Sequence, residues 1–172
     1  DNVAPIILGG ITLVRSINEI DVIKLPTPKS LEVIIIRPNI EIKTSDSRKV
    51  LRKKVKIEEM VQQSANLGSF VSSLYNEDFN LMSRSIVDII AEPNRRILIP
   101  EFDNIIKLSK INGAIAAGIS GSGPSIFSLS KDTIISEKIL KATTDHYNKL
   151  GISYDGFISK INTTGIKILE SN

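Results

Sequence analysis

The feature that most constrains the fold of this chain is a glycine- and serine-rich segment between two short apolar runs. The sequence GISGSGP occupies residues 118–124, the small residues GAIAA precede it, and Ser125-Ile126-Phe127 follows it. Glycines permit positive φ and close backbone approach, and the serines add hydroxyl and N–H groups that can face an anion or another loop. Pro124 has a fixed φ and no N–H, so it ends the loop. The pattern predicts an ordered strand–loop–strand beside a phosphate, and a hairpin turn that contacts nothing is the alternative.

Three common glycine loops do not fit this segment. It lacks the Gly-Lys-Ser/Thr ending of the Walker loop. Its glycines at 118, 121 and 123 do not have the G-x-G-x-x-G spacing of a dinucleotide site. A nucleophile elbow requires G-x-S-x-G, and Ser122 stands where the last glycine should be.

The composition narrows the classes of protein to which this chain can belong. The 172 residues suffice for one domain and a fragment of another, and 41% hydrophobic with 24% charged residues is typical of a globular protein. The net charge is +3 and the only dense basic run covers residues 48–56, so we expect no nucleic-acid partner. No apolar run approaches the ~20 residues that span a bilayer, so we expect no membrane partner either. Cysteine is absent and His146, the single histidine, is assigned no role; the many charges and absent thiols favour a cytoplasmic protein.

Hydrophobic periodicity predicts alternating strands and helices. Helices are predicted over residues 2–8, 57–74, 79–90, 102–111 and 134–150, with a further short helix capped by Ser45-Asp46 and ending at Leu51. Strands are predicted over residues 11–15, 22–25, 31–36, 153–160 and 165–169, and on both sides of the glycine loop. In helix 57–74 an apolar stripe consists of Met60, Val61, Ala65, Leu67, Phe70, Val71 and Leu74. From residue 31 onward the order predicts an α+β fold, an antiparallel sheet with helices on one face.

Three separated stretches resemble the GHMP kinases, a superfamily of small-molecule kinases, and among them most closely the homoserine kinases. The glycine loop followed by Ser-Ile-Phe is similar to the third signature motif of the superfamily. The opening Asp-Asn-Val-Ala-Pro of residues 1–5, closing on Gly9-Gly10, is similar to a segment of homoserine kinases. The sequence RRILIP of residues 95–100 is similar to a segment of the family in which an arginine stands shortly before Leu-Ile-Pro. The three matches occur in family order over nearly the whole chain.

The resemblance implies a domain division. Residues 29–172 would form the ferredoxin-like C-terminal domain of a GHMP kinase, and residues 1–28 would be a remnant of the N-terminal kinase domain. The nucleotide loop of the family precedes the Asp-Asn-Val segment, and nothing here matches it. We therefore expect the C-terminal half of a homoserine-kinase-like protein, inactive alone, whose N-terminal half is a partner. ATP and Mg²⁺ would be the cofactors, with the metal ligands in the missing half.

Homoserine carries a carboxylate, an ammonium and a hydroxyl, and a planar guanidinium suits the carboxylate because its fork matches the two oxygens. Arg48 follows Thr44 in a Thr-x-x-x-Arg step, and the resemblance implies that it grips the substrate carboxylate. Arg95 matches the second clamping arginine, with Arg96 as the adjacent alternative if the register slips. Thr44 is a further candidate donor to the substrate. Solvated loop or helix-end charges are the alternative explanation of these arginines.

The resemblance assigns further residues around the phosphoryl group. Asn2 matches the asparagine that contacts the substrate close to the transferred phosphoryl group, although Asp1-Asn2 can also cap the following helix. Supporting the phosphate loop would be Gly118, Ser120, Gly121, Ser122 and Gly123, with the two serines reaching across. No metal ligand is assigned to this chain.

The expected function is therefore ATP-dependent phosphorylation of the L-homoserine hydroxyl to O-phospho-L-homoserine, a step of threonine biosynthesis. Another GHMP kinase, of the mevalonate-pathway or galactose type, is one alternative. A non-catalytic ferredoxin-like module for ligand binding or dimerisation is another, since fold does not decide function. An RNA-binding sheet would need stacking aromatics, of which the chain has few. A homodimer is possible on this sequence and is left open.

Overall fold

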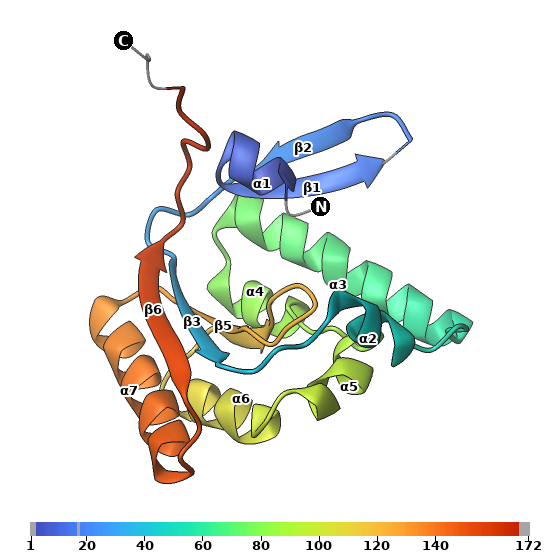
Figure 1. The fold of residues 1–172 in the computed structure, drawn as a ribbon. Coiled ribbons are helices and arrows are strands. Elements are labelled where there is room, and N and C mark those ends of the chain that lie inside the picture. The colour runs from blue at the N-terminus through green and yellow to red at the C-terminus, as the bar shows by residue number, and fades with distance from the viewer. Residues whose placement is uncertain (1–2, 17, 169–172) are drawn as a thin grey trace.

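The computed structural model describes residues 3–16 and 18–168 (Figure 1). The helices are α1 (Val3–Leu8), α2 (Thr44–Lys49), α3 (Ile57–Asn76), α4 (Phe79–Ser85), α5 (Glu92–Arg95), the 3-10 turn η1 (Arg96–Leu98), α6 (Phe102–Ile111) and α7 (Thr133–Lys149). The strands are β1 (Ile11–Ser16), β2 (Asp21–Leu25), β3 (Glu32–Pro38), β4 (Ala116–Ile119), β5 (Ile126–Ser130) and β6 (Tyr154–Lys160).

The main sheet has four antiparallel strands in the order β4-β5-β3-β6. Ile34 at the middle of β3 pairs with Ser128 on one side and Ile158 on the other. A β-α-β-β-α-β succession with this strand order is the ferredoxin-like arrangement. The predicted α+β class, the antiparallel sheet and the glycine-rich β4–β5 hairpin are therefore confirmed.

One face of the sheet packs against α6 and α7. Side chains alternate between the faces of a strand, so the buried Ile34, Ile36 and Ile126 lie on the same face. Ile36 and Ile126 form the main core with side chains of the two helices and the segment before them. This core consists of Ile36, Ile99, Phe102, Ile105, Ile126 and Tyr147.

Polar groups inside this core are paired, as buried polar groups generally are. The buried carboxylate of Glu32 accepts hydrogen bonds from the hydroxyls of Thr133 (2.8 Å) and Ser136 (2.7 Å). The Tyr147 hydroxyl donates to the carbonyl of Pro100 at 3.0 Å, and burial raises the pKa of Tyr147 to about 12. These contacts fix α7 against β3 and against the segment that leads into α6.

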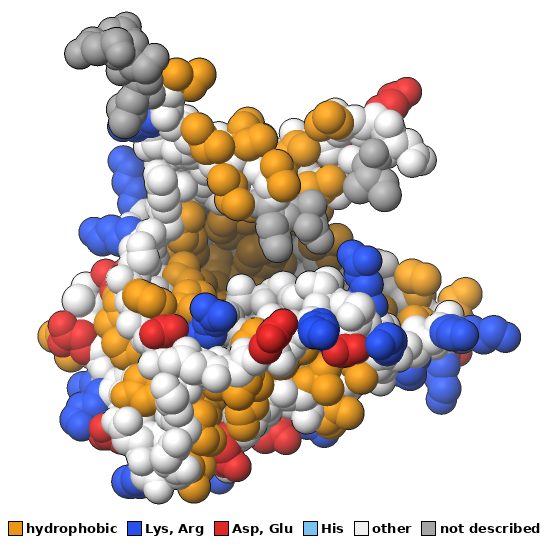
Figure 2. Space-filling view, viewed as in Figure 1, with side chains coloured by type: hydrophobic (Ala, Val, Ile, Leu, Met, Phe, Trp, Pro, Cys, Tyr) orange, Lys and Arg blue, Asp and Glu red, His pale blue; other side chains and the backbone are white. Residues whose placement is uncertain are grey.

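The opposite face of the sheet is only partly covered, by α3 and α4. A second core joins Leu25, Leu31, Leu74 and Met82, with Leu129 of β5 packed against it. Beside this core lies an apolar pocket of about 400 Å³ whose lining includes residues of β1, α3 and β5. Figure 2 shows this side of the molecule as a hollow with a hydrophobic floor and with Lys, Arg, Asp and Glu side chains along one rim.

The N-terminal unit, α1 with the β1–β2 pair, stands apart from the main sheet (Figure 1). No described residue of α1 is buried. Lys24 on β2 joins this unit to the other end of the chain, because its ammonium donates to the carbonyls of Leu8 (3.0 Å) and Thr163 (3.1 Å). The Gly10 amide donates to the carbonyl of Asn162 at 2.7 Å. The C-terminal segment therefore closes over the end of α1.

The predicted strand over residues 165–169 is wrong for residues 165–168, which form no regular element, and residue 169 lies outside the described residues. The reason is that this segment crosses to α1 rather than continuing along the sheet. The Ile166 amide donates to the carbonyl of Ile7 at 3.3 Å, and the backbone of Gly165 lies so close to the end of α1 that no side chain would fit there.

Helix α3 buries the C-terminal part of its predicted apolar stripe, where Phe70, Val71 and Leu74 join the second core, but not the N-terminal part. Met60 and Val61 are 56% and 63% exposed, whereas Asn66 and Ser73 are buried beside Leu74. The reason lies in what α3 faces, which is partly the polar backbone of a loop rather than only hydrophobic side chains. Part of the predicted stripe is consequently left on the surface.

Candidate functional site

Three segments far apart in the sequence meet at one place: α2, α5 and the loop between β4 and β5. The Ser47 hydroxyl of α2 donates to the carbonyl of Ser122 at 2.8 Å. From α5, the Arg95 guanidinium donates to the carbonyl of Gly121 at 3.0 Å, with a longer contact of 3.4 Å to the carbonyl of Ser47. Arg95 is therefore anchored against the glycine loop and beside α2, the helix that carries Arg48.

The glycine loop is a tight hairpin connection. The Ser120 amide donates to the carbonyl of Ser125 at 2.8 Å, and the Gly123 amide donates to the carbonyl of Ser120 at 3.1 Å. Gly121 and Gly123 have φ of +62° and +79°, values that only glycine adopts at little cost. The loop thus requires glycine at both positions.

Helix α5 has one turn, and its position depends on Asp88. The carboxylate of Asp88 accepts from the amides of Ile90 (2.8 Å), Ala91 (2.8 Å) and Glu92 (3.2 Å). A carboxylate that accepts from these otherwise unpaired amides stabilises the start of a helix. Asp88 therefore fixes the turn from which Arg95 projects.

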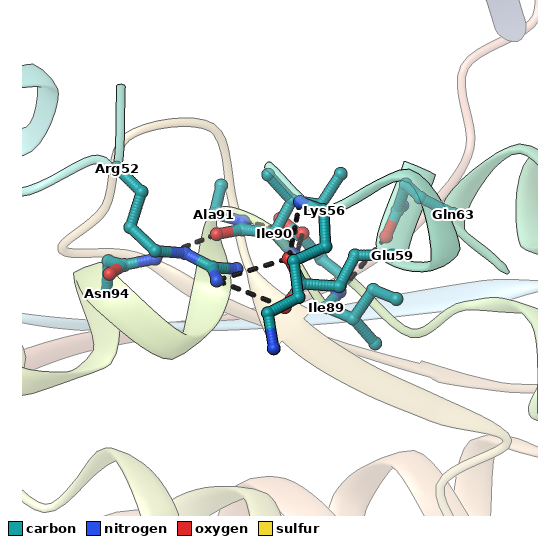
Figure 3. A network of polar contacts seen from close by, with 9 residues as sticks. Arg52, Lys56, Glu59, Gln63, Ile89, Ile90, Ala91 and Asn94 are labelled. Atoms are coloured by element: carbon teal, nitrogen blue, oxygen red, sulfur yellow. Dashed lines mark hydrogen bonds and ion pairs between the residues drawn. The ribbon is translucent and has the colours of Figure 1, made fainter. Parts of the chain in front are cut away.

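The loop before α5 is in turn held by polar side chains of α3 (Figure 3). The Gln63 side-chain carbonyl accepts from the amide of Ile89 at 3.0 Å, and the Asn66 amide group donates to the carbonyl of Val87 at 3.0 Å. The predicted helix over residues 79–90 is therefore wrong beyond Ser85, where α4 ends. Its last residues make hydrogen bonds to α3 instead of to the preceding turn.

A charged group at the start of α3 extends this network (Figure 3). The Arg52 guanidinium contacts both carboxylate oxygens of Glu59, at 3.0 and 3.2 Å, and the Lys56 amide donates to Glu59 at 3.1 Å. The Lys56 amide first, and then Arg52, lower the pKa of Glu59. The segment after α2 is thereby tied to α3, so α2 and α5 share the same support.

Glu92, at the first position of α5, was not singled out by the sequence analysis, and neither was Asp88. Oε2 of Glu92 accepts a hydrogen bond from the amide of Ile119 at 3.2 Å, where β4 enters the glycine loop. An acidic residue directly before a proline at a helix start was the signal that could have drawn attention to it. Glu92 and Arg95 thus contact the loop at two places.

Glu92 and Arg95 also line a pocket of about 120 Å³ against the glycine loop. The lining consists of Ile86, Asp88, Glu92, Arg95, Ala117, Gly118, Ile119, Gly121 and Phe127. Ile86, Asp88 and Phe127 also line the larger apolar pocket, so the two spaces adjoin. The arrangement places a cation and two carboxylates beside the loop, at the edge of the apolar hollow.

Burial raises the pKa of Glu92, and the neighbouring Asp88 adds to the effect, although the Ile119 amide opposes it. The folded protein therefore binds this proton more tightly than the unfolded chain does, and stability falls as pH rises above the ordinary glutamate pKa of about 4.3. We expect Glu92→Gln to be more stable than the wild type at neutral pH, with the difference shrinking towards pH 4. Urea unfolding of both proteins across this range measures it, and a difference independent of pH would contradict the expectation.

The other predicted site residues lie in different settings. Thr44 and Arg48 are both exposed on α2, one turn apart, which places them on the same side of the helix. Arg96 is exposed and its guanidinium pairs with Asp103 at 3.0 Å, whereas the guanidinium of Arg95 contacts the glycine loop. Asn2 lies outside the described residues. Of the two adjacent arginines, Arg95 is therefore the one that contacts the glycine loop.

Among residues 3–16 and 18–168, no three His, Asp or Glu side chains come together in a way that could hold a metal ion. Within the same part of the chain, no helix has the length and apolar character needed to cross a membrane.

The comparison with protein families matches residues 70–149 to the C-terminal domain of the GHMP kinases. This range contains α4, α5, the glycine loop and α7. Together with the ferredoxin-like sheet and the loop it carries, the match shows that the chain contains a GHMP kinase C-terminal domain.

Within that superfamily the chain is similar to homoserine kinases over nearly all of its length. It is 36% identical to the homoserine kinase of Chlorobium phaeobacteroides and 34% identical to that of Aquifex aeolicus, in each case over 98% of this chain. The crystal structure of homoserine kinase from Cytophaga hutchinsonii superposes with a TM-score of 0.92 at 41% identity, over 95% of this chain and 52% of that one. The chain spans about half the length of the curated relatives it matches, 53% and 57% in these two cases.

More distant structures share only the fold. Phosphomevalonate kinase of Streptococcus pneumoniae superposes with a TM-score of 0.64 at 14% identity, over 82% of this chain. Similarity to homoserine kinases therefore extends to the sequence, whereas that to phosphomevalonate kinase is limited to the architecture.

Proposed function

We propose that the protein to which this chain belongs transfers the γ-phosphoryl group of ATP to the hydroxyl of L-homoserine, giving O-phospho-L-homoserine for threonine biosynthesis. The observation that carries the proposal is the similarity to homoserine kinases along 98% of the chain. The convergence of α2, α5 and the glycine loop supports it, because these segments bear the residues that the resemblance assigns to the substrate and to the phosphate.

In this proposal Arg48 and Arg95 bind the homoserine carboxylate. Guanidinium groups suit this role because each presents paired donors that match the two carboxylate oxygens. The hydroxyl of Thr44 adds a donor, and Asn2 holds the reacting hydroxyl near the phosphoryl group. Phosphoryl transfer depends mainly on positioning and charge stabilisation, so this chain needs no strongly basic side chain.

The glycine loop supports the phosphate site rather than holding the nucleotide by itself. Its residues at 118 and 120–123 would pack beside a nucleotide loop contributed by the preceding half, with Ser120 and Ser122 facing it. The Mg²⁺ that accompanies ATP would supply positive charge at the phosphates. We place its ligands in the preceding half as well, as the resemblance implies.

The surface of the N-terminal unit supports such a partner. Val3, Ile6 and Ile20 are 63%, 60% and 95% exposed on α1 and the β1–β2 pair. A two-stranded pair is at best marginally stable by itself, so this face is suited to cover by the preceding half of the protein. We accordingly assign residues 1–28 to the kinase domain and residues 29–172 to the C-terminal domain, in a cytoplasmic enzyme.

We expect the isolated chain to show no kinase activity, and coexpression with the preceding half to restore turnover. The measurement is formation of ADP and O-phospho-L-homoserine from ATP and L-homoserine. Mevalonate and phosphomevalonate serve as competing substrates, because another GHMP kinase activity is the alternative. Turnover of either in place of homoserine by the complete protein would contradict the proposed function.

A further inference from the structure

We propose that Glu92 is a positioning residue that fixes the entry to the glycine loop, and that Gly118 is glycine because the Glu92 carboxylate occupies the space of a side chain there. The kinetic part of this inference rests on the proposed kinase function. Its structural part concerns only contacts between α5 and β4.

The first step is the fit between the two residues. A Cβ added at Gly118 would lie 2.9 Å from Oε2 of Glu92 and 3.2 Å from the ring of Phe127. Gly118 is absent from the residues with positive φ, so its backbone would accept a side chain, but a Cβ there would have to displace the Glu92 carboxylate. The same Oε2 accepts from the next amide in the chain, that of Ile119. Because Gly118 has no side chain, the Glu92 carboxylate can reach this amide.

The second step is that α5 contacts the loop at both of its sides. Glu92 binds the entry at Ile119, and Arg95, one turn later, binds the carbonyl of Gly121. Asp88 holds the start of this turn from the other side. Loss of the Glu92 contact would therefore release the entry to the loop while Asp88 still held α5 and Arg95 in place.

This difference predicts distinct kinetic effects for the two residues. In the complete protein, Glu92→Ala should lower kcat and raise the KM for ATP, by about 10²-fold in kcat/KM, because small displacements of a positioning group have effects of that size. The KM for homoserine should change little, since Arg95 keeps its place. Glu92→Gln retains an oxygen that accepts from Ile119, so it should remain near the wild type.

The sharpest test is a double-mutant cycle between the two positions. Gly118→Ala should displace the carboxylate and reduce activity about as much as Glu92→Ala does. The double variant should be no worse than either single variant, because both remove the same contact. Gly156→Ala is a matched control in the same sheet, since its Cβ would meet only the flexible end of Leu140 at 2.9 Å and a methyl of Thr144. Its effect should simply add to that of Glu92→Ala.

Hydrogen exchange at the Ile119 amide provides a readout that does not depend on activity. Exchange should accelerate in Glu92→Ala and Gly118→Ala and remain slow in Glu92→Gln. Additive effects of Glu92→Ala and Gly118→Ala, or unchanged Ile119 exchange in Glu92→Ala, would overturn the inference. A wild-type protein that does not phosphorylate homoserine would overturn the proposed function instead, and exchange would still decide whether Glu92 anchors the loop.

Discussion

Replacing Arg95 by Ala in the complete protein should raise the KM for L-homoserine by an amount equivalent to roughly 2–5 kcal/mol of binding energy. At about 1.4 kcal/mol per factor of ten, this is about 30-fold to several thousand-fold. The reason is that the substrate carboxylate would lose its paired donors in a partly buried setting. Steady-state kinetics with varied homoserine at saturating ATP measure the change.

Arg96→Ala provides the comparison that decides between the two adjacent arginines. Arg96 pairs with Asp103 at the surface, and exposed pairs of this kind contribute little to stability. The homoserine KM should therefore stay close to the wild-type value. A large effect of Arg96→Ala combined with a small effect of Arg95→Ala would show that the register is shifted by one residue. Thermal unfolding of both variants separates loss of binding from loss of fold.

Replacing Ile126 by Ala should lower the free energy of unfolding by about 2–5 kcal/mol. Ile126 is fully buried at the start of β5 and belongs to the main core between the sheet and its two helices. The substitution removes buried hydrophobic contacts and leaves a cavity that the close-packed surroundings cannot fill. Equilibrium denaturation in urea measures the loss.

Ile134→Ala is the control for this prediction, because it makes the same chemical change where the side chain is 64% exposed. Its effect should remain within about 0.5 kcal/mol, as for most surface substitutions. Equal destabilisation by both variants would show that the sheet and its helices do not form the core described above.

Local sequence patterns predicted most of the architecture because they reflect local causes. Glycines around the loop, the Gly9-Gly10 end of α1 and the Gly151 end of α7 each mark a backbone requirement that neighbours cannot override. The predicted strand over residues 31–36 likewise corresponds to β3, whose burial alternates as the geometry of a strand requires. The predicted boundaries fail where a distant partner replaces a local hydrogen bond. Helix α4 ends early because Gln63 and Asn66 bind the backbone that would have continued it.

In the candidate site, too, local motifs could be predicted from the sequence, whereas contacts between distant segments could not. Arg95 could be identified from its place in a motif, but its contact with Gly121 could not be predicted, since the two residues are brought together only by the fold. Glu92 was missed because the contact of its carboxylate with the Ile119 amide depends on the lack of a side chain at Gly118, a property of packing rather than of sequence spacing. Asp88 was missed because its segment was predicted as helix, where its carboxylate would have faced solvent.

The most direct test of the account is a crystal structure of the complete protein with L-homoserine bound. The account predicts the substrate carboxylate within hydrogen-bond distance of the guanidinium groups of Arg48 and Arg95, beside the glycine loop. A carboxylate bound elsewhere, with both guanidinium groups facing solvent, would contradict it.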